Sequence, residues 1–334
     1  WAKWLALALV GALVLAGHDE APGPVERVFG RIPTHERGYV GFALVGVVAL
    51  VGAWMQTHPL LAATSEKLSP KRLLAVQQSL VDAGAVEPPL AAHRVRDRGL
   101  AHYGPEQVES LANRHDIFKW LEVEQPRTAL LRDIDVAATY QHRRLKGLPM
   151  YVLDDAHARL RLVANVLPEG MVDRNRIPEV LFTEPPQLEH ETLVRFEQFV
   201  EVVGWQIDEP VVRGRKHTLQ LVFKVLRPMP GGAKVFARLL GGKLSRINPD
   251  PQPLAEDLYP CNLWRPGDYV LHRYTFEAPL LEIVPGPHDF VIGLRRGETK
   301  NFEISVPEGK DGEHGVRIDD TKRAFAKLGT VQVY

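Results

Sequence analysis

The sequence predicts a membrane-anchored α+β protein with two N-terminal transmembrane helices, a small α/β region and a jelly-roll-like C-terminal β-sandwich. Three observations predict this fold class. Two long apolar blocks lie within the first 60 residues, a strand–helix–strand pattern follows, and short alternating segments separated by glycine and proline fill the C-terminal part. The predicted domains are residues 1–59 (transmembrane), 60–199 (α/β) and 200–334 (β-sandwich).

The two apolar blocks predict membrane spans at about residues 1–17 and 39–55. The first block is short for a full span. The second carries no charge and has an aromatic residue near each end, Tyr39 and Trp54, as interfacial anchors do. The alternative is a pair of buried core helices, but a soluble core helix seldom lacks a polar face. Basic residues flank the second block on both sides, so charge does not decide its orientation.

Composition excludes some classes of function. Lysine plus arginine and aspartate plus glutamate both number 41, so the formal net charge is zero, which argues against a nucleic-acid-binding protein. Cys261 is the only cysteine, which excludes an internal disulfide framework and a cysteine-rich zinc site. A single cysteine suits the periplasm and the cytosol equally, so it does not assign a compartment.

The middle of the chain predicts an α/β region. Ser69-Pro70 is typical of a helix start, with serine as the cap and proline at the first helical position, and Gly84 ends this helix. Gly104-Pro105 opens a second predicted helix over residues 106–121. The pattern then predicts a strand, a helix and two strands, at residues 127–131, 133–146, 150–153 and 159–166.

Several groups in this region could hold a metal ion or transfer a proton, but each has a simpler explanation. Asp154-Asp155 with His157 could be metal ligands or an acid–base pair, yet aspartate is common in turns between strands. Asp173-x-Asn175 is similar to the start of a calcium loop, without the glycine and glutamate that such a loop needs. The histidines at positions 93, 102 and 115 share no ligand spacing. We therefore predict no metal site, no cofactor and no catalytic residue in this chain.

The C-terminal part predicts a β-sandwich, because short alternating segments recur with turn residues between them. We expect a pair of strands within residues 193–206. The second strand of this pair is the first strand of the sandwich. The predicted strands are 202–207, 217–225, 234–240, 268–277, 288–294, 301–306 and 330–334.

A proline-rich loop, Arg246–Val270, interrupts this pattern, and its prolines make it stiff. Most aromatic residues of the sandwich are expected in the core, with Tyr259 and Trp264 as the expected exceptions because they lie on this loop. Trp264 either plugs the edge of the sandwich or offers a face on which a sugar ring stacks. The predicted ligand or partner contacts are Trp264, Tyr259, Asp250 and Arg246.

Five groups of residues follow one another in an order found in one known family. They are Tyr151-Val152-Leu153-Asp154 with Leu162-Val163-Ala164-Asn165, Val203-Gly204-Trp205 with Arg213-Gly214, Arg246-x-Asn248-x-Asp250, Tyr259-Pro260 with Trp264-x-Pro266-Gly267-Asp268, and Gly293-Leu294-Arg295. With these groups, residues 60–334 resemble the C-terminal portion of a bacterial polyprenol-phosphate-dependent membrane glycosyltransferase of the protein O-mannosyltransferase and aminoarabinose transferase type.

The resemblance implies an enzyme that moves a sugar from a polyprenol-phosphate donor to a glycan or protein acceptor. It implies a place in the bacterial inner membrane, in contact with membrane lipid, with residues from about 60 to 334 extracytoplasmic. The family's catalytic acidic residue lies in a first extracytoplasmic loop that has no counterpart here, so no catalytic residue is carried over. Because the chain begins at Trp1, we expect it to be the C-terminal fragment of a longer protein.

The alternative hypothesis is a two-span membrane protein that displays a carbohydrate- or protein-binding β-sandwich and has no activity. It rests on the lack of any catalytic motif, since the sequence contains no G-x-S-x-G, no H-E-x-x-H and no P-loop.

Overall fold

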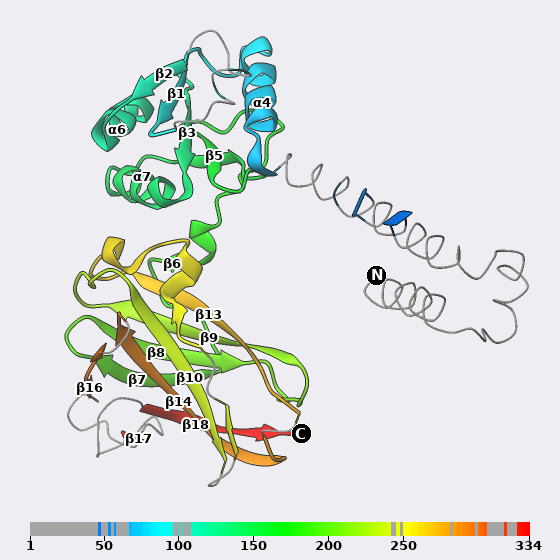
Figure 1. Ribbon diagram of the computed structural model, residues 1–334. Coiled ribbons are helices and arrows are strands. Elements are labelled where there is room, and N and C mark those ends of the chain that lie inside the picture. Colours follow the sequence, from blue (N-terminus) through cyan, green and yellow to red (C-terminus); the bar gives the residue numbers. More distant parts are fainter. Residues whose placement is uncertain are drawn as a thin grey trace, which may run out of the picture. The chain divides into compact units, whose positions relative to one another are not determined.

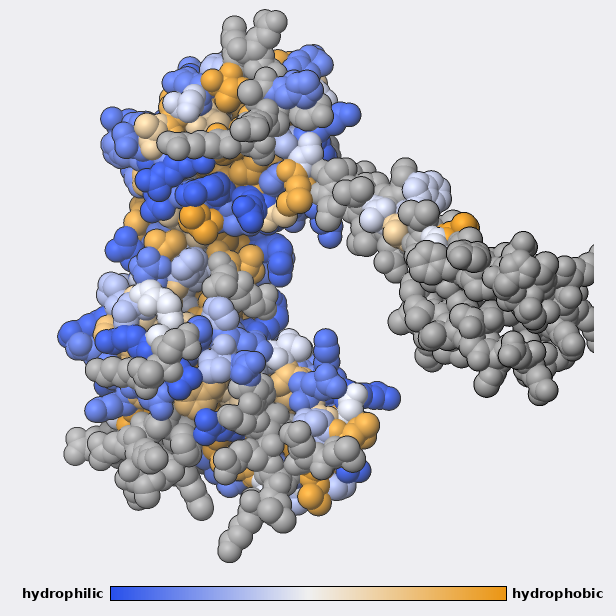
Figure 2. All heavy atoms as spheres, viewed as in Figure 1, coloured by the Kyte–Doolittle hydropathy of each residue, from blue (hydrophilic) through white to orange (hydrophobic). Residues whose placement is uncertain are grey.

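A computed structural model describes residues 46–47, 53–54, 57, 67–95, 100, 102, 108–241, 245–247, 250–280, 283–297, 300–305, 317–318 and 326–334. The chain divides into two compact units, residues 1–72 with 156–158, and residues 73–155 with 159–334. Figure 1 shows the elements of the second unit, which holds nearly all of the described secondary structure. On the face shown in Figure 2, hydrophilic residues cover much of the described surface, with smaller hydrophobic areas between them.

The predicted membrane spans fall almost wholly outside the described residues. Of the second predicted span, residues 46–47 and 53–54 are described, and they are helical. Within the described part of the chain, the structure has no helix with the length and apolar character needed to cross a membrane. The described fold is therefore that of an α+β protein rich in β-sheet.

The α/β region is a five-stranded sheet with helices on both faces. Its strand order is β2-β1-β3-β5-β4, in which β1 pairs in parallel with β2 and β3, and β5 lies antiparallel between β3 and β4. The strands are β1 (Leu90–His93), β2 (Val108–Leu111), β3 (Thr128–Arg132), β4 (Tyr151–Asp154) and β5 (Leu160–Ala164), and the helices are α4 (Lys71–Asp82), α6 (Arg114–Glu122) and α7 (Asp133–Leu145).

Alternate residues of these strands enter two different core clusters, which explains why successive residues in the middle of β1 and β3 are apolar. Leu90, Ala92 and Leu130 join the cluster that contains Leu73 and Leu74 of α4. Ala91, Ala129 and Leu131 join the cluster that contains Ile117 and Leu121 of α6 and Val136 of α7. Helix α4 therefore covers one face of the sheet, while α6 and α7 cover the other.

The predicted helix over 106–121 is wrong in its first half. Residues Val108–Leu111 form β2, which pairs with β1 along its whole length, and the helix begins only at Arg114. A capping box between Asn113 and Asp116 provides a helix start that the apolar spacing alone did not reveal. Strand β1 was not predicted, because its sequence LAAH has neither alternation nor a β-branched residue.

The C-terminal part is a sandwich of two antiparallel sheets, as predicted. One sheet has the order β16-β7-β8-β9-β13-β6, and the other has β11-β10-β14-β18-β17, with β12 paired to β10 and β15 paired to β14. The first sheet contains β6 (Leu181–Phe182), β7 (His190–Phe196), β8 (Val200–Ile207), β9 (Lys216–Val225), β13 (Tyr269–Glu277) and β16 (Ile304–Ser305). The second contains β10 (Ala233–Gly241), β11 (Ser245–Ile247), β12 (Gln252–Pro253), β14 (Gly286–Arg296), β15 (Lys300–Asn301), β17 (Arg317–Ile318) and β18 (Ala326–Val333).

The core of the sandwich joins the inner faces of the two sheets. Trp205 of β8 stacks on Phe290 of β14, with ring centroids 5.6 Å apart, so one aromatic pair connects both sheets. Gly329 of β18 lies against this pair, because a Cβ at that position would come within 2.6 Å of the Trp205 ring. Strands β6 and β7 already belong to the sandwich, so it includes residues that precede position 200.

Candidate functional site

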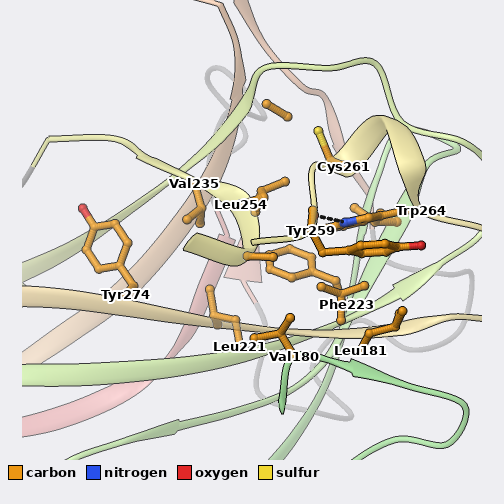
Figure 3. Close-up of a cluster of buried hydrophobic side chains, with 14 of the residues drawn as sticks. Val180, Leu181, Leu221, Phe223, Val235, Leu254, Tyr259, Cys261, Trp264 and Tyr274 are labelled. Carbon is orange, nitrogen blue, oxygen red and sulfur yellow. Dashed lines mark hydrogen bonds between the residues drawn. The ribbon is translucent and has the colours of Figure 1, made fainter. Parts of the chain in front are cut away.

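The proline-rich loop folds into the sandwich core instead of presenting its aromatic rings. Tyr259 and Trp264 are both 0% exposed. The indole Nε1 of Trp264 donates a hydrogen bond to the main-chain oxygen of Tyr259 at 2.9 Å, drawn as the dashed line in Figure 3. Phe223 and Leu254 lie in the same cluster (Figure 3). Both rings were expected to be exceptions to the core, and their burial shows that this is wrong. The burial of Trp264 agrees with the alternative in which this ring plugs the sandwich rather than offering a stacking face.

The same loop is anchored to helix α7. The Tyr259 hydroxyl lies within hydrogen-bonding distance of Gln141 Oε1 and of the Leu263 oxygen. Burial raises the pKa of Tyr259 above its ordinary value, so its hydroxyl stays protonated. Asp268, at the end of the loop, forms an ion pair with Arg144. These contacts give the loop a structural role between α7 and the sandwich.

The other two predicted contact residues do not complete a site with these rings. Asp250 is exposed, and its main-chain oxygen accepts a hydrogen bond from the Tyr274 hydroxyl at 3.0 Å. Arg246 pairs with Leu240 through the ladder between β11 and β10, and its side chain lies outside the described part. Of the four, the structure places Tyr259 and Trp264 in direct contact.

The groups considered as metal ligands have structural partners. His157 Nε2 lies 3.0 Å from the Leu68 oxygen, and Asp155 forms an ion pair with Arg174 at 3.2 Å. Asp173 Oδ1 accepts hydrogen bonds from the backbone N–H groups of Val152 and Asn175, both at 2.9 Å, and so shapes a turn. No group of three or more metal-binding side chains occurs among the residues that the structure describes.

A groove on the outer face of the six-stranded sheet is the candidate binding site. This outer groove has a volume of about 420 Å³ and is lined by β7, β8, β9, β13 and residues 185–188. Its floor is apolar, formed by Val203, Gly204 and Val222. Gly204 lies close to the groove wall, since a Cβ there would meet the His190 oxygen at 3.4 Å and the Leu188 side chain at 3.6 Å.

Three polar side chains cross the groove in one row. The strand register places Glu201 of β8 opposite Lys224 of β9, and Lys224 opposite Tyr269 of β13. Residues that face each other in adjacent antiparallel strands project from the same face. The row therefore sets a carboxylate, an ammonium group and a phenol ring side by side.

The polar groups of this row retain hydrogen-bonding capacity. Both hydrogen bonds from Arg195 end on Oε1 of Glu201, which leaves Oε2 without a partner among the described residues. Lys224 Nζ and the Tyr269 hydroxyl likewise make no hydrogen bond or ion pair with any residue in the described part. Together they offer one acceptor, one cationic donor and one group that both donates and accepts.

Sequence reasoning missed this row because its three members come from three strands separated by loops of unequal length. The sequence carried one signal for these residues, the alternation of polar and apolar residues along each strand. The three residues are polar or amphipathic and face outward, while the inward-facing residues of the same strands are apolar. The alternation indicates which face they occupy, but only the register shows that they are neighbours.

Two solved structures are similar to parts of this chain. A crystal structure of a Niemann-Pick type C2 protein from the Japanese carpenter ant shares 8% sequence identity, covers 41% of this chain and 93% of its own, and gives a TM-score of 0.26. The C-terminal domain of wzt shares 7% identity over 46% of this chain and 83% of its own, with a TM-score of 0.27. Both TM-scores are low, so neither likeness bears on what this chain does. No protein-family model and no curated protein sequence matches the chain.

Proposed function

We propose that the C-terminal sandwich is a carbohydrate-binding module that holds a sugar in the outer groove. The observation that carries this proposal is the row Glu201, Lys224 and Tyr269 beside an apolar floor. Glu201 Oε1 is bound by Arg195, while Glu201 Oε2, Lys224 Nζ and the Tyr269 hydroxyl have no partner among the described residues. A volume of about 420 Å³ is within the range of small-molecule sites.

The chemistry of the row suits a polyol. Each sugar hydroxyl donates one hydrogen bond and accepts others, so it pairs with both a carboxylate oxygen and an ammonium group. The C–H face of a sugar ring is apolar and packs against an aromatic face, which Tyr269 would supply. Glu201 and Lys224 would fix the orientation of the ring, while Val222 and Gly204 would exclude water beneath it.

A peptide ligand fits this groove less well. Peptides commonly bind a sheet by adding a strand to a free edge. Strands β8, β9 and β13 each pair with a strand on both sides, while the outer partner of β7, strand β16, pairs with it only at Arg195 and Phe196. A ligand in the groove would therefore bind through side chains, which favours a compact polyol over an extended backbone.

The experiment is a glycan array followed by calorimetry with the strongest ligand, using the full chain. Tyr269→Ala and Lys224→Met should each weaken binding about tenfold, the equivalent of about 1.4 kcal/mol. Thr275→Ala, an exposed change on the same strand but outside the groove, is the control and should bind as the wild type does. Equal affinity of all four proteins, or the lack of any glycan ligand, would refute the proposal.

We further propose, on the resemblance of residues 60–334, that this module belongs to an integral membrane glycosyltransferase that uses a polyprenol-phosphate sugar. The outer groove would then bind the acceptor glycan outside the membrane, while the acidic catalytic group would come from elsewhere in the protein. The gene sequence upstream of Trp1 tests this second proposal. It requires further membrane helices and an acidic first loop, and it fails if neither is encoded.

A further inference from the structure

A second cavity lies in the α/β region, and three arginines surround it. It has a volume of about 260 Å³, and Arg161, Arg174 and Arg176 line it together with Asp133 and Asp155. We propose that this arginine cavity binds the phosphate group of a phosphate monoester. The site is separate from the outer groove and uses none of its residues.

The fold places the cavity where α/β sheets commonly bind ligands. Strands β3 and β4 run in the same direction, because each lies antiparallel to β5. Asp133 follows the last residue of β3, and Asp155 follows the last residue of β4. Ligands of open α/β sheets bind outside the carboxyl ends of the strands, which is where these two residues lie.

The segment that carries two of the arginines is held rigidly against β4. Asp173 Oδ1 accepts the N–H groups of Val152 and Asn175, and the Arg174 N–H donates to the Val152 oxygen at 2.8 Å. Asn175 Oδ1 then accepts the N–H of Ile177 at 3.1 Å. These hydrogen bonds hold the backbone on both sides of Arg174 and Arg176, so binding of an anion would have to order only the side chains.

Each arginine of the cavity forms an ion pair with a carboxylate, and two of these carboxylates belong to the wall. Asp133 pairs with Arg161 at 3.1 Å, and Asp155 pairs with Arg174 at 3.2 Å. Arg176 Nε lies 3.7 Å from Glu179 Oε2, and Glu179 does not line the cavity. The lining itself therefore consists of three guanidinium groups and two carboxylates. Planar guanidinium groups match the oxygens of a phosphate, and several of them around one cavity are a common phosphate-binding arrangement.

The remaining wall identifies the ligand as an ester and not a bare ion. Val136, Val152, Ile177 and Leu258 form an apolar part of the cavity next to the charged part. Inorganic phosphate is hydrated on all sides and gains nothing from such a wall, whereas the organic group of a monoester buries apolar surface there. The monoester can be a soluble metabolite or the headgroup of a lipid, since both carry the same phosphate.

The experiment titrates the full chain with three probes: inorganic phosphate, phenyl phosphate, and vesicles of phosphatidylcholine with or without phosphatidic acid. Binding is followed by calorimetry for the soluble probes and by co-sedimentation for the vesicles, at physiological ionic strength to screen weak surface attraction. Phenyl phosphate should bind more tightly than inorganic phosphate. Binding to phenyl phosphate alone supports a soluble ligand, and added binding to phosphatidic acid vesicles supports a lipid headgroup.

Two variants are expected to change the affinity for phenyl phosphate in opposite directions. Arg174→Gln should weaken phenyl phosphate binding about tenfold, whereas Asp155→Asn should strengthen it, because it removes a negative charge from the wall. Arg215→Gln, at an exposed turn of the sandwich, is the control for a lost surface charge and should have no effect. If Arg174→Gln does not fold, the affinities of Arg174→Lys and Asp155→Asn for phenyl phosphate test the proposal instead. The proposal is overturned if no probe binds, or if Asp155→Asn leaves the affinity unchanged or lowers it.

Discussion

Asp268, the residue before β13, forms an ion pair with Arg144 of α7, in which Oδ1 of Asp268 and Nη1 of Arg144 are 2.8 Å apart. The carboxylate is almost buried, and its other oxygen, Oδ2, accepts the N–H of Arg265 at 3.0 Å. One side chain therefore closes the turn before β13 and ties the loop to the helix of the neighbouring region.

Removal of Arg144 should destabilise the fold, because the buried Asp268 side chain would lose its ion-pair partner. We expect Arg144→Ala to lower the free energy of unfolding by about 2 kcal/mol, as is typical of a lost hydrogen bond to a charged group. Guanidinium denaturation measures the effect. A double-mutant cycle with Asp268→Ala isolates the pair, and a coupling energy near zero would show that the two residues act independently.

The burial of Trp264 predicts a large effect of its truncation. Trp264→Ala should destabilise the chain by about 3–5 kcal/mol, because it leaves a cavity and removes the hydrogen bond to Tyr259. Thermal unfolding is the measurement. Trp264→Phe keeps part of the packing and should cost less. An unchanged melting temperature for Trp264→Ala would contradict the buried position.

Gly329 should not tolerate a side chain. Its Cβ would come within 2.6 Å of the Trp205 ring, which is itself held by the stack on Phe290. Gly329→Ala is expected to cost about 1–3 kcal/mol of stability through overpacking. The matched control is Gly231→Ala, whose Cβ would meet only Asn262 at 3.7 Å, and chemical denaturation should find that variant close to the wild type.

We expect the protein to lose stability in mild acid because of the buried side chain of His272. Burial lowers its pKa from 6.5 to about 3, and its Nδ1 accepts the N–H of Ala255 at 3.1 Å. Between pH 6.5 and about 3 the unfolded chain binds a proton that the folded chain does not, so the stability contributed by neutral His272 is lost as pH falls. The slope should approach about 1.4 kcal/mol per pH unit within this window.

Urea unfolding at several pH values in this window measures that slope. His272→Gln should make the dependence shallower, since glutamine does not titrate. His115→Gln, at an exposed position, is the control and should leave the dependence as in the wild type. The same slope in the wild type and in His272→Gln would show that His272 does not cause it.

The fold was largely predictable because its strands alternate and its turns carry glycine or proline. Strands β8, β9, β10, β13 and β14 lie within a few residues of their predicted positions. The error at residues 108–111 arose because a short strand followed by a capped helix has almost the same apolar spacing as one longer helix.

The candidate sites were less predictable, because they depend on register and on long-range contacts. Tyr259 and Trp264 belong to a loop whose composition suggests exposure, and only the fold shows that it closes the core. Glu201, Lys224 and Tyr269 are far apart in sequence, and nothing in the local pattern indicates that they are adjacent. Arg161 and Arg174 likewise line the same cavity only because β5 lies beside β4.

The insertion of β5 between β3 and β4 has a consequence for synthesis on the ribosome. A nascent chain that ends near residue 155 contains β3 and β4, but these strands have no hydrogen bonds to each other. The sheet is completed only when residues 160–164 emerge and fill the gap. Strand β4 therefore has no partner strand until β5 has been synthesised. A truncation before residue 160 would leave β4 as an unpaired strand that is prone to aggregation.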